Sequence, residues 1–271
     1  MNDRITAGIE RFVAETPANT RTDGGLYFDP PLVGFAAQDD PLFTDYKRII
    51  GDHHLLPSAF LADEDGAAPA AGTVICWVLP ISQEVRESNR LKERVPSRLW
   101  SHTRQYGEAL NGALRRHLVA HLEELGHRAV APQYSPLWRE IATPAGPTST
   151  WSERHAAYAA GLGTFSLNDG LITPRGIAHR CGSVVTDLVI PPTPRTAPDH
   201  THNCLYHRNG SCGACVARCP VGALSLKGHD KPLCRDYVYG TLPAELAERY
   251  GVQATGCGLC QTRVPCEFRI P

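Results

Sequence analysis

Eight of the ten cysteines lie in the last quarter of the chain, between residues 204 and 266. Four belong to the stretch CLYHRNGSCGACVARCP (204–220), where gaps of seven, two and three residues separate them. The other four are Cys234, Cys257, Cys260 and Cys266. So many thiols in so short a segment indicate metal coordination or disulfides, and they constrain this region more than any hydrophobic pattern does.

The number and spacing of these cysteines predict two [4Fe-4S] clusters, because each cube takes four thiolates. In bacterial ferredoxins, closely spaced cysteines bind one cube while a cysteine before proline binds the other, and Cys219-Pro220 fits the second role. A CxxC loop can direct two sulfurs and several backbone amides at one cube. We assign a first cysteine set, Cys204, Cys212, Cys215 and Cys266, and a second cysteine set, Cys219, Cys234, Cys257 and Cys260.

Cys204 stands apart from its neighbours, so we interpret LYHRNGS (205–211) as an insertion that turns back through Asn209-Gly210. Two zinc sites of four cysteines each are an alternative, since zinc also uses CxxC pairs. The cysteine before proline and the interleaving of the two sets favour iron. Disulfides are disfavoured in a reducing compartment.

Composition excludes several classes of protein. The 271 residues are 42% hydrophobic and 20% charged, which is ordinary for one or two globular domains. The net charge of -1 gives no general attraction to nucleic acid or to anionic membrane. The polar first 25 residues lack a signal-peptide core, and no apolar run reaches the length of a membrane span. We therefore expect a cytoplasmic protein without a membrane partner.

Helical and strand patterns alternate up to residue 190, which predicts a layered α/β domain. We expect helices over 3–15, 101–125 and 152–163; leucines line one face of the second, and Gly126 ends it. Buried strands are expected over 31–37, 73–79, 127–133 and 183–190. Cys76 and Cys181 lie outside the cysteine-rich segment, and we expect both to be packing residues.

The stretch PPTPRTAP (191–198) holds four prolines in eight residues and suggests a domain boundary. We therefore predict two domains, an α/β cofactor and substrate domain over 1–195 and a cluster domain over 196–271.

Two stretches carry a family resemblance: AAGLGTFSLNDGLITPRGIAHRCGSVVTDL (159–188) and the cysteine motifs, with LCRDY around Cys234 between them. They resemble the epoxyqueuosine reductases, with the reductive dehalogenases as more distant relatives. The resemblance implies an α/β (α+β) nitroreductase-like cofactor domain followed by a two-cluster bacterial ferredoxin-like domain.

In that family the clusters pass single electrons to a cobalamin, which reduces the substrate. The resemblance thus implies cobalamin as a cofactor, a ferredoxin or flavodoxin as electron donor and a small organic substrate. The residues that would lie along the cobalamin are Gly161, Leu162, Gly163, Thr164, Ser166, Asn168, Leu171 and Ile172. Glycines allow a backbone to approach a flat ligand, and small polar side chains can bond its amides.

This sequence departs from the family pattern at the proton donor. The family carries an Asp fourteen residues before the first glycine of Gly-Leu-Gly, and here that position is Pro147. The family's exact reaction therefore does not follow from the resemblance for this chain, and neither does transfer RNA as its substrate. As alternative acids we name Tyr158, His155 and Glu153, on the helix that leads into Gly161. Packing or surface roles are the alternative for each of them.

Two other functions remain open. The chain could be an electron-transfer partner protein whose α/β domain docks a protein and binds no corrinoid. It could also be a reductase or chaperone for corrinoids, with cobalamin as its substrate.

Overall fold

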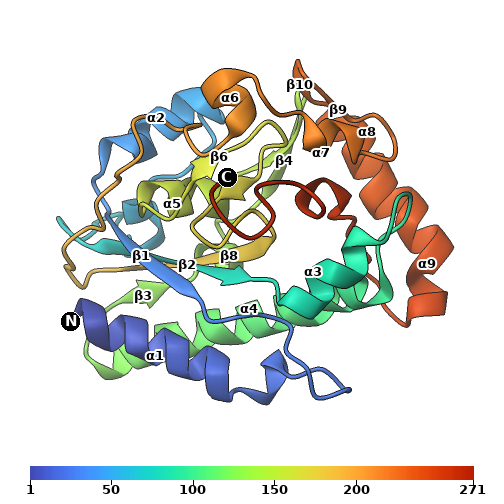
Figure 1. Cartoon of the computed structure of the whole chain (residues 1–271). Helices are drawn as coiled ribbons and strands as arrows, with labels where there is room; N and C mark the ends of the chain where they lie inside the picture. Colours follow the sequence, from blue (N-terminus) through green and yellow to red (C-terminus); the bar gives the residue numbers. More distant parts are fainter.

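A four-stranded antiparallel sheet, in the order β1-β2-β8-β3, lies at the centre of the structure, a computed structural model that describes residues 1–271 (Figure 1). The strands are β1 (Leu32–Ala37), β2 (Thr73–Pro80), β3 (Ala129–Val130) and β8 (His179–Thr186). β2 pairs with β1 on one side and with β8 on the other along its whole length. A mixed α and β architecture is therefore confirmed.

The fully buried strand β2 divides the interior into two hydrophobic cores, because successive side chains of a strand point to opposite faces. Ile75, Trp77 and Leu79 pack with helices α1 (Asn2–Glu15) and α4 (Arg98–Glu124). Val74, Cys76 and Val78 pack with α2 (Pro41–Ile49) and α5 (Glu153–Ala159). Figure 1 shows α1 and α4 on one side of the sheet and α2 and α5 on the other.

The helices expected over 3–15 and 101–125 are confirmed as α1 and α4. The side chain of Ser97 accepts a hydrogen bond from the backbone N–H of Trp100 (3.1 Å), so α4 begins with a capping serine. Four of its leucines are buried, and Gly126 adopts a φ of 85° directly after the helix. The helix expected over 152–163 is shorter, because Gly161 takes a φ of 74° soon after α5 ends.

Two strand predictions were wrong in their bounds. The strand expected over 127–133 is only β3, because Pro132 begins a 3-10 helix (Pro132–Tyr134). The strand expected over 183–190 is β8, which begins four residues earlier and ends at Thr186. After Thr186 the backbone forms hydrogen bonds with the hydroxyl of Thr73 instead of with a strand. This hydroxyl donates to Leu188 O (2.7 Å) and accepts from Ile190 N (2.9 Å). Loop backbone therefore replaces the end of the expected strand.

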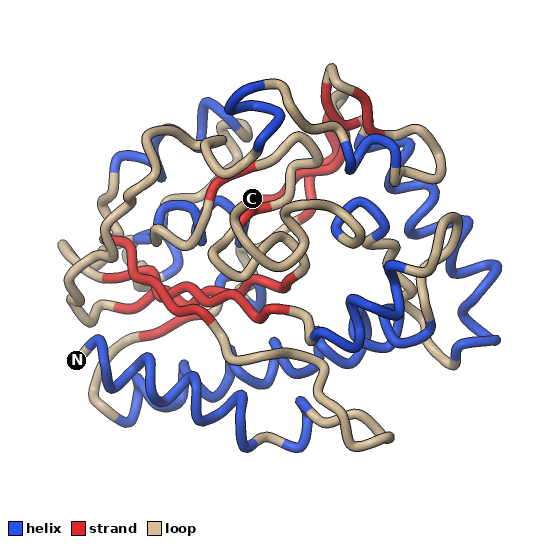
Figure 2. Tube along the Cα trace, in the orientation of Figure 1, coloured by secondary structure: helices blue, strands red, loops and turns tan.

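Much of the chain after residue 190 is loop, with short elements between the turns (Figure 2). Its helices are α6 (Leu205–Asn209), α7 (Ala214–Ala217), α8 (Lys231–Arg235), a π-helix (Asp236–Thr241) and α9 (Leu242–Tyr250). Three small hairpins lie outside the central sheet, and only the last of them follows residue 190. They are β4 (Glu140–Thr143) with β5 (Gly146–Ser149), β6 (Thr164–Phe165) with β7 (Leu171–Ile172), and β9 (Leu224–Ser225) with β10 (Gly228–His229). Helix α3 (Gln83–Arg90) precedes α4 and contacts this region.

The proline-rich stretch runs along the outer edge of β1. Thr193 N donates to Phe35 O (2.8 Å), and Phe35 N donates to the Thr193 hydroxyl (3.0 Å). Arg195 continues the contact through Asp40 and Ala159 O. This stretch therefore protects an edge strand, and a division at residues 195 and 196 stays a prediction.

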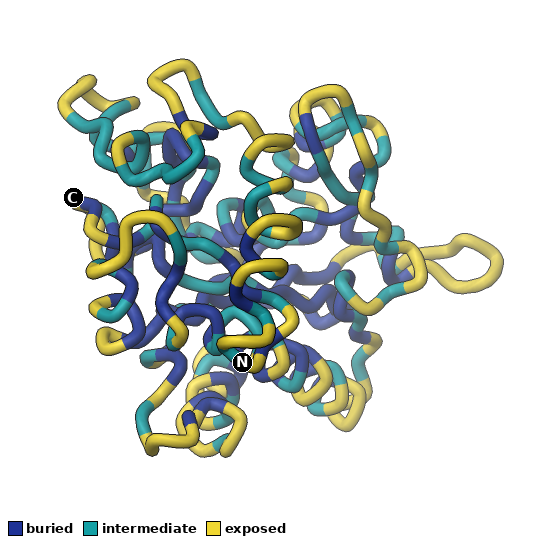
Figure 3. Tube along the Cα trace, turned by 90° about the vertical axis from the view of Figure 1, so that its right-hand side faces the viewer, coloured by how far each residue is buried: buried dark blue, intermediate teal, exposed yellow.

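Figure 3 shows the buried segments running through the middle of the molecule, with exposed turns around them. No helix combines the length and apolar character needed to cross a membrane.

A buried histidine predicts acid sensitivity of the fold. His54 is 1% exposed, and its Nε2 accepts the backbone N–H of Ser152 (3.3 Å). Burial lowers the pKa of His54 to about 4. A histidine with a depressed pKa stabilises the fold fully above about pH 6.5, and this contribution is lost as the pH falls toward 4. We expect the free energy of unfolding to fall by roughly 3 kcal/mol per such group across this window.

Urea titrations followed by tryptophan fluorescence at pH 7 and pH 4.5 measure this loss. His54→Gln should show a smaller pH dependence, because the glutamine side chain does not titrate. The exposed His200→Gln should behave as the unmodified protein. Equal pH dependence in His54→Gln and the unmodified protein would show that His54 does not contribute.

Candidate metal centre

The first cysteine set is gathered around one small apolar pocket. Cys204, Cys212, Cys215 and Cys266 all line it, although 62 positions separate the first from the last. Leu167, Ile172 and Val264 form the apolar wall. Cys266 is fixed against the sheet domain because its carbonyl accepts the N–H of Ile177 (2.8 Å). The structure therefore brings together the four residues that the spacing assigned to one cluster.

The insertion between Cys204 and Cys212 forms a short helix. Residues Leu205–Asn209 make up α6, and Gly210 ends it in the left-handed conformation with a φ of 73°. The expected turn at Asn209-Gly210 is thus present, but a helical turn precedes it. Cys204 is 7% exposed and starts α6, so the insertion leaves the pocket and returns to it.

The Cys257–Cys260 loop of the second cysteine set is held from three sides. Gly258 lies in the Cys257–Cys260 loop with a φ of 66°, and a Cβ there would come within 1.9 Å of the Trp100 ring. Asn89 donates to the carbonyl of Cys257 (3.4 Å), and Asn168 donates to that of Cys260 (3.0 Å). Glycine is therefore required at 258, both for its backbone conformation and for contact with α4.

Electrostatics support the same grouping. Burial raises the pKa of Cys215 to about 11, and Cys204 and Cys212 raise it further. Burial likewise raises the pKa of Cys266 to about 12, with added effects from three members of the first set. Within the second set, burial raises the pKa of Cys257 to about 12, and Cys234 and Cys219 raise it further. Crowded buried thiols need positive charge nearby to ionise together.

A [4Fe-4S] cluster fits these donor sets, because its iron ions compensate four thiolates that burial alone would keep protonated. The side chains that would hold the clusters are the eight cysteines assigned above. No group of three or more His, Cys, Asp or Glu side chains is arranged to hold a single metal ion. Cluster identity and number stay a prediction.

The two outlying cysteines lie in the hydrophobic core of the sheet domain. Cys76 is fully buried in β2 and packs on the side of α2 and α5. Cys181 packs against the same core, and its Sγ lies 3.4 Å from Nδ1 of His179. Burial raises the pKa of Cys181 to about 12. Both thiols therefore act as packing groups, as the sequence predicts.

The three predicted acids lie on α5 in different surroundings. Glu153 pairs with Arg115 (3.1 Å) and accepts the hydroxyl of Ser183, and burial raises its pKa. His155 contacts the Ser152 hydroxyl through Nδ1 (2.8 Å), and burial lowers its pKa to about 3. Tyr158 is half-buried, and burial raises its pKa. Glu153 is thus a partly buried carboxyl group paired with an arginine, and His155 is uncharged at neutral pH.

The segment predicted along a corrinoid is mostly buried and engaged within the protein. Thr164 accepts the N–H of Asn203 (2.8 Å), Ser166 donates to Gly170 O (3.0 Å), and Asn168 donates to the Cys260 loop. Leu162, Leu171 and Ile172 are also buried, while Gly161 and Gly163 are partly exposed. These side chains join the sheet domain to the cysteine loops, and as placed they do not fit a corrinoid-binding surface.

A cavity of about 600 Å³ lies elsewhere, between α4, β3 and residues 134–137. It is lined mainly by apolar side chains, with Arg115 and Arg116 at its wall. None of the residues predicted as cofactor-binding, catalytic or metal-binding lines this cavity.

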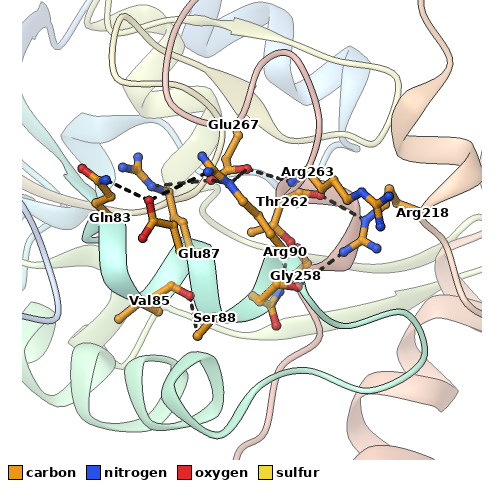
Figure 4. Close-up of polar contacts among 12 residues, drawn as sticks. Gln83, Val85, Glu87, Ser88, Arg90, Arg218, Gly258, Thr262, Arg263 and Glu267 are labelled. Carbon is orange, nitrogen blue, oxygen red and sulfur yellow. Dashed lines mark hydrogen bonds and ion pairs between the residues drawn. The ribbon is translucent and has the colours of Figure 1, made fainter.

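Sequence reasoning missed the polar residues that hold the cysteine loops in place. Arg218 lies between the last cysteines of CLYHRNGSCGACVARCP, and Glu267 directly follows Cys266. Asn89 lies on α3, a helix that was not predicted from the sequence. Figure 4 shows Glu267 directed at Arg90, and Arg218 beside Thr262 and Gly258. The sequence did offer a signal for Arg218 and Glu267, because each is a charged residue adjacent to a predicted cysteine ligand.

A mixed α and β fold in which eight cysteines fall into two sets is typical of a metal-binding protein. Among curated proteins, the chain is 32% identical to an epoxyqueuosine reductase of Bacillus anthracis over 123 residues, 44% of this chain and 30% of that protein. It is 24% identical to the epoxyqueuosine reductase of Francisella cf. novicida over 235 residues, 84% of this chain and 59% of that one. No protein-family profile matches the chain.

Solved structures share the fold of this chain. A selenomethionine-labelled epoxyqueuosine reductase aligns with 98% of this chain and 65% of its own, with a TM-score of 0.54 and 18% identity. An epoxyqueuosine reductase with an epoxyqueuosine-modified tRNA-Tyr stem loop aligns with a TM-score of 0.52 and 19% identity, over 98% of this chain and 65% of its own. The chain is thus similar to epoxyqueuosine reductases, as the sequence predicts, and it covers less than two thirds of the length of each of these proteins.

The assignment of Cys204 predicts a specific loss of iron. Cys204→Ala removes one of four ligands from the first cysteine set, so we expect the chain to keep the second cluster and to lose about half of its iron. Cys181→Ala is the matched control, because it removes a partly buried thiol outside both sets. Iron and sulfide analysis after anaerobic reconstitution measures the difference. Unchanged iron in Cys204→Ala would show that the assignment is wrong.

Proposed function

We propose that this protein is an iron-sulfur reductase of the epoxyqueuosine reductase type. The two cysteine sets would each hold a [4Fe-4S] cluster in a ferredoxin-like domain, and the clusters would pass single electrons toward a second cofactor in the nitroreductase-like domain. The proposal is carried by one observation: the four cysteines of the first set, spread over 63 positions, line one pocket, and in the second set Cys234 and Cys219 act electrostatically on Cys257. Similarity to proteins named epoxyqueuosine reductase supports the reaction class.

Cobalamin as the electron acceptor is part of this proposal and is supported by similarity alone. When bound, it would supply a cobalt centre able to reduce a substrate. The Gly161 segment offers partly exposed glycines but no free polar side chain, because Thr164, Ser166 and Asn168 are engaged internally. We therefore propose only that the two cysteine sets of this chain carry the electrons as far as the second cofactor.

Proton supply distinguishes this chain from its relatives. Pro147 lies in β5, opposite Ala142 of β4, so the hairpin presents no acid at the position where the family carries one. Among the predicted replacements, Glu153 is the one whose pKa is raised by burial from the carboxyl range, although Arg115 opposes that shift. We propose Glu153, tied to Ser183 and Arg115, as a proton reservoir for the reduction.

Partners follow from the same reasoning. A ferredoxin or flavodoxin would donate electrons one at a time, and a small organic molecule would be reduced. One structural relative holds an epoxyqueuosine-modified tRNA stem loop, and we extend only the possibility of a modified nucleoside to this chain. A cytoplasmic location suits the proposal, because thiol ligands stay reduced there. A carrier without corrinoid, or a corrinoid chaperone, are the rival functions, and the comparisons do not favour them.

Cofactor analysis tests the proposal directly. Protein purified without oxygen should contain about eight irons and about eight sulfides per chain, with visible absorbance that falls on reduction. After reconstitution, titration with cobalamin should give saturable binding with a change in the cobalamin spectrum. Protein without iron would contradict the whole proposal. Two clusters without cobalamin binding would instead establish the rival electron carrier.

A further inference from the structure

Both cysteine loops are fastened to α3, and they meet different charges there (Figure 4). At the first set, Glu267 follows Cys266 and is 1% exposed. Its carboxylate accepts a hydrogen bond from Nε of Arg90 (2.8 Å) and lies 3.7 Å from Nε of Arg86. It also accepts the backbone N–H of Arg263 (2.7 Å).

The charges around Glu267 balance. Arg90 also reaches Glu87 (4.0 Å), and nearby Arg175 pairs with Asp29 (3.1 Å). Three arginines therefore face three carboxylates: Arg86, Arg90 and Arg175 against Glu87, Glu267 and Asp29. The first set thus adjoins a group of ion pairs with little net charge.

Arg218 gives the second set a different environment. Its Nε donates to the carbonyls of Leu259 (3.2 Å) and Thr262 (3.1 Å), and Leu259 lies between the ligands Cys257 and Cys260. Its other nitrogens donate to Lys92 O (2.7 Å) and Asn89 O (3.5 Å) on the side of α3. All four partners are neutral carbonyls, and no carboxylate lies within ion-pair distance of Arg218.

Other charges near Arg218 do not cancel it. Besides the thiols of Cys257 and Cys260, which raise its pKa, the charged groups that act on it are Arg263, which is also positive, and Glu93. Both are exposed, so solvent screens them. Arg218 is half-buried against the Cys257–Cys260 loop and keeps its positive charge there.

We propose that Arg218 is a positioning residue that holds the Cys257–Cys260 loop against α3 and whose positive charge makes the second cluster easier to reduce than the first. The inference rests on the proposed function, in which each cysteine set holds a [4Fe-4S] cluster. Reduction adds one electron to a cluster, and a fixed positive charge nearby stabilises the added negative charge. The balanced ion pairs beside Cys266 give the first cluster no comparable stabilisation. Electrons then rest on the cluster held by Cys219, Cys234, Cys257 and Cys260.

The test compares two substitutions that separate charge from position. Arg218→Gln removes the charge but keeps N–H donors for the carbonyls, whereas Arg218→Lys keeps the charge and loses the planar fork. Arg208→Gln is the matched control, because it removes an equal charge from the exposed end of α6. Iron and sulfide analysis and a redox titration followed by electron paramagnetic resonance are applied to each protein.

We expect Arg218→Gln to retain both clusters and to lower the potential of the second cluster alone. A change of about tenfold in its reduction equilibrium corresponds to about 59 mV for one electron. Arg218→Lys should keep a potential close to that of the unmodified protein, and Arg208→Gln should change neither potential. Loss of the second cluster from Arg218→Gln but not from Arg218→Lys would also support the role of the charge.

Two results would overturn the inference: unchanged potentials in Arg218→Gln, or equal changes in Arg218→Gln and Arg218→Lys. Analysis of the unmodified protein separates this failure from that of the proposed function. Absence of clusters contradicts the proposed function, whereas two clusters with unchanged potentials in Arg218→Gln contradict only the role of Arg218.

Discussion

The cysteine-bearing part of the chain depends on polar contacts, because it has almost no hydrophobic core of its own. Its apolar cluster has five buried members, against 22 and 16 for the clusters on the two faces of the sheet. Three of those five, Leu167, Ile172 and Ile177, belong to the first part of the chain. A segment with so small a core would gain stability from a metal cluster held by its cysteines, so that cluster binding and folding would become one process.

Helix α3 acts as the common support of that segment. Asn89 donates to Cys257 O and to the Thr262 hydroxyl, while Arg90 pairs with Glu267 beside Cys266. The same eight-residue helix thus fixes one loop from each cysteine set. Because hydrogen bonds and ion pairs are directional, these contacts define the relative position of the two sets more closely than apolar packing of this size could.

The periodic parts of the fold were predictable from the sequence. The leucines of α4 and the unbroken apolar run of β2 carry their own signal, since each period matches one secondary structure. The ends of β3 and β8 were not predictable, because Pro132 and the hydroxyl of Thr73 act through local geometry and a distant contact. Helix α3 was missed because its buried residues include Arg86 and Asn89, whose burial depends on partners beyond residue 250.

The candidate site shows the same division. Cysteine spacing alone grouped residues as distant as Cys204 and Cys266, because ligand number is a strong constraint. The Gly161 segment was less predictable, since nothing local showed that Asn168 donates to the Cys260 loop. Likewise, α5 was predicted as a helix, but the pairing of Glu153 with Arg115 joins residues 38 positions apart.

The closed path of α6 has a consequence for how this region can vary. The seven residues between Cys204 and Cys212 start and finish at one pocket, and a Cβ added at Gly210, which ends the helical turn, would meet no atom within 4 Å. Doubling the length of such a loop costs only about 0.6 kcal/mol in closure entropy. Foreign sequence, such as a peptide tag or a spectroscopic label, could therefore be inserted beside Gly210 while both flanking thiols keep their places. A reporter so placed would sit within one helical turn of the first cysteine set without replacing any of its ligands.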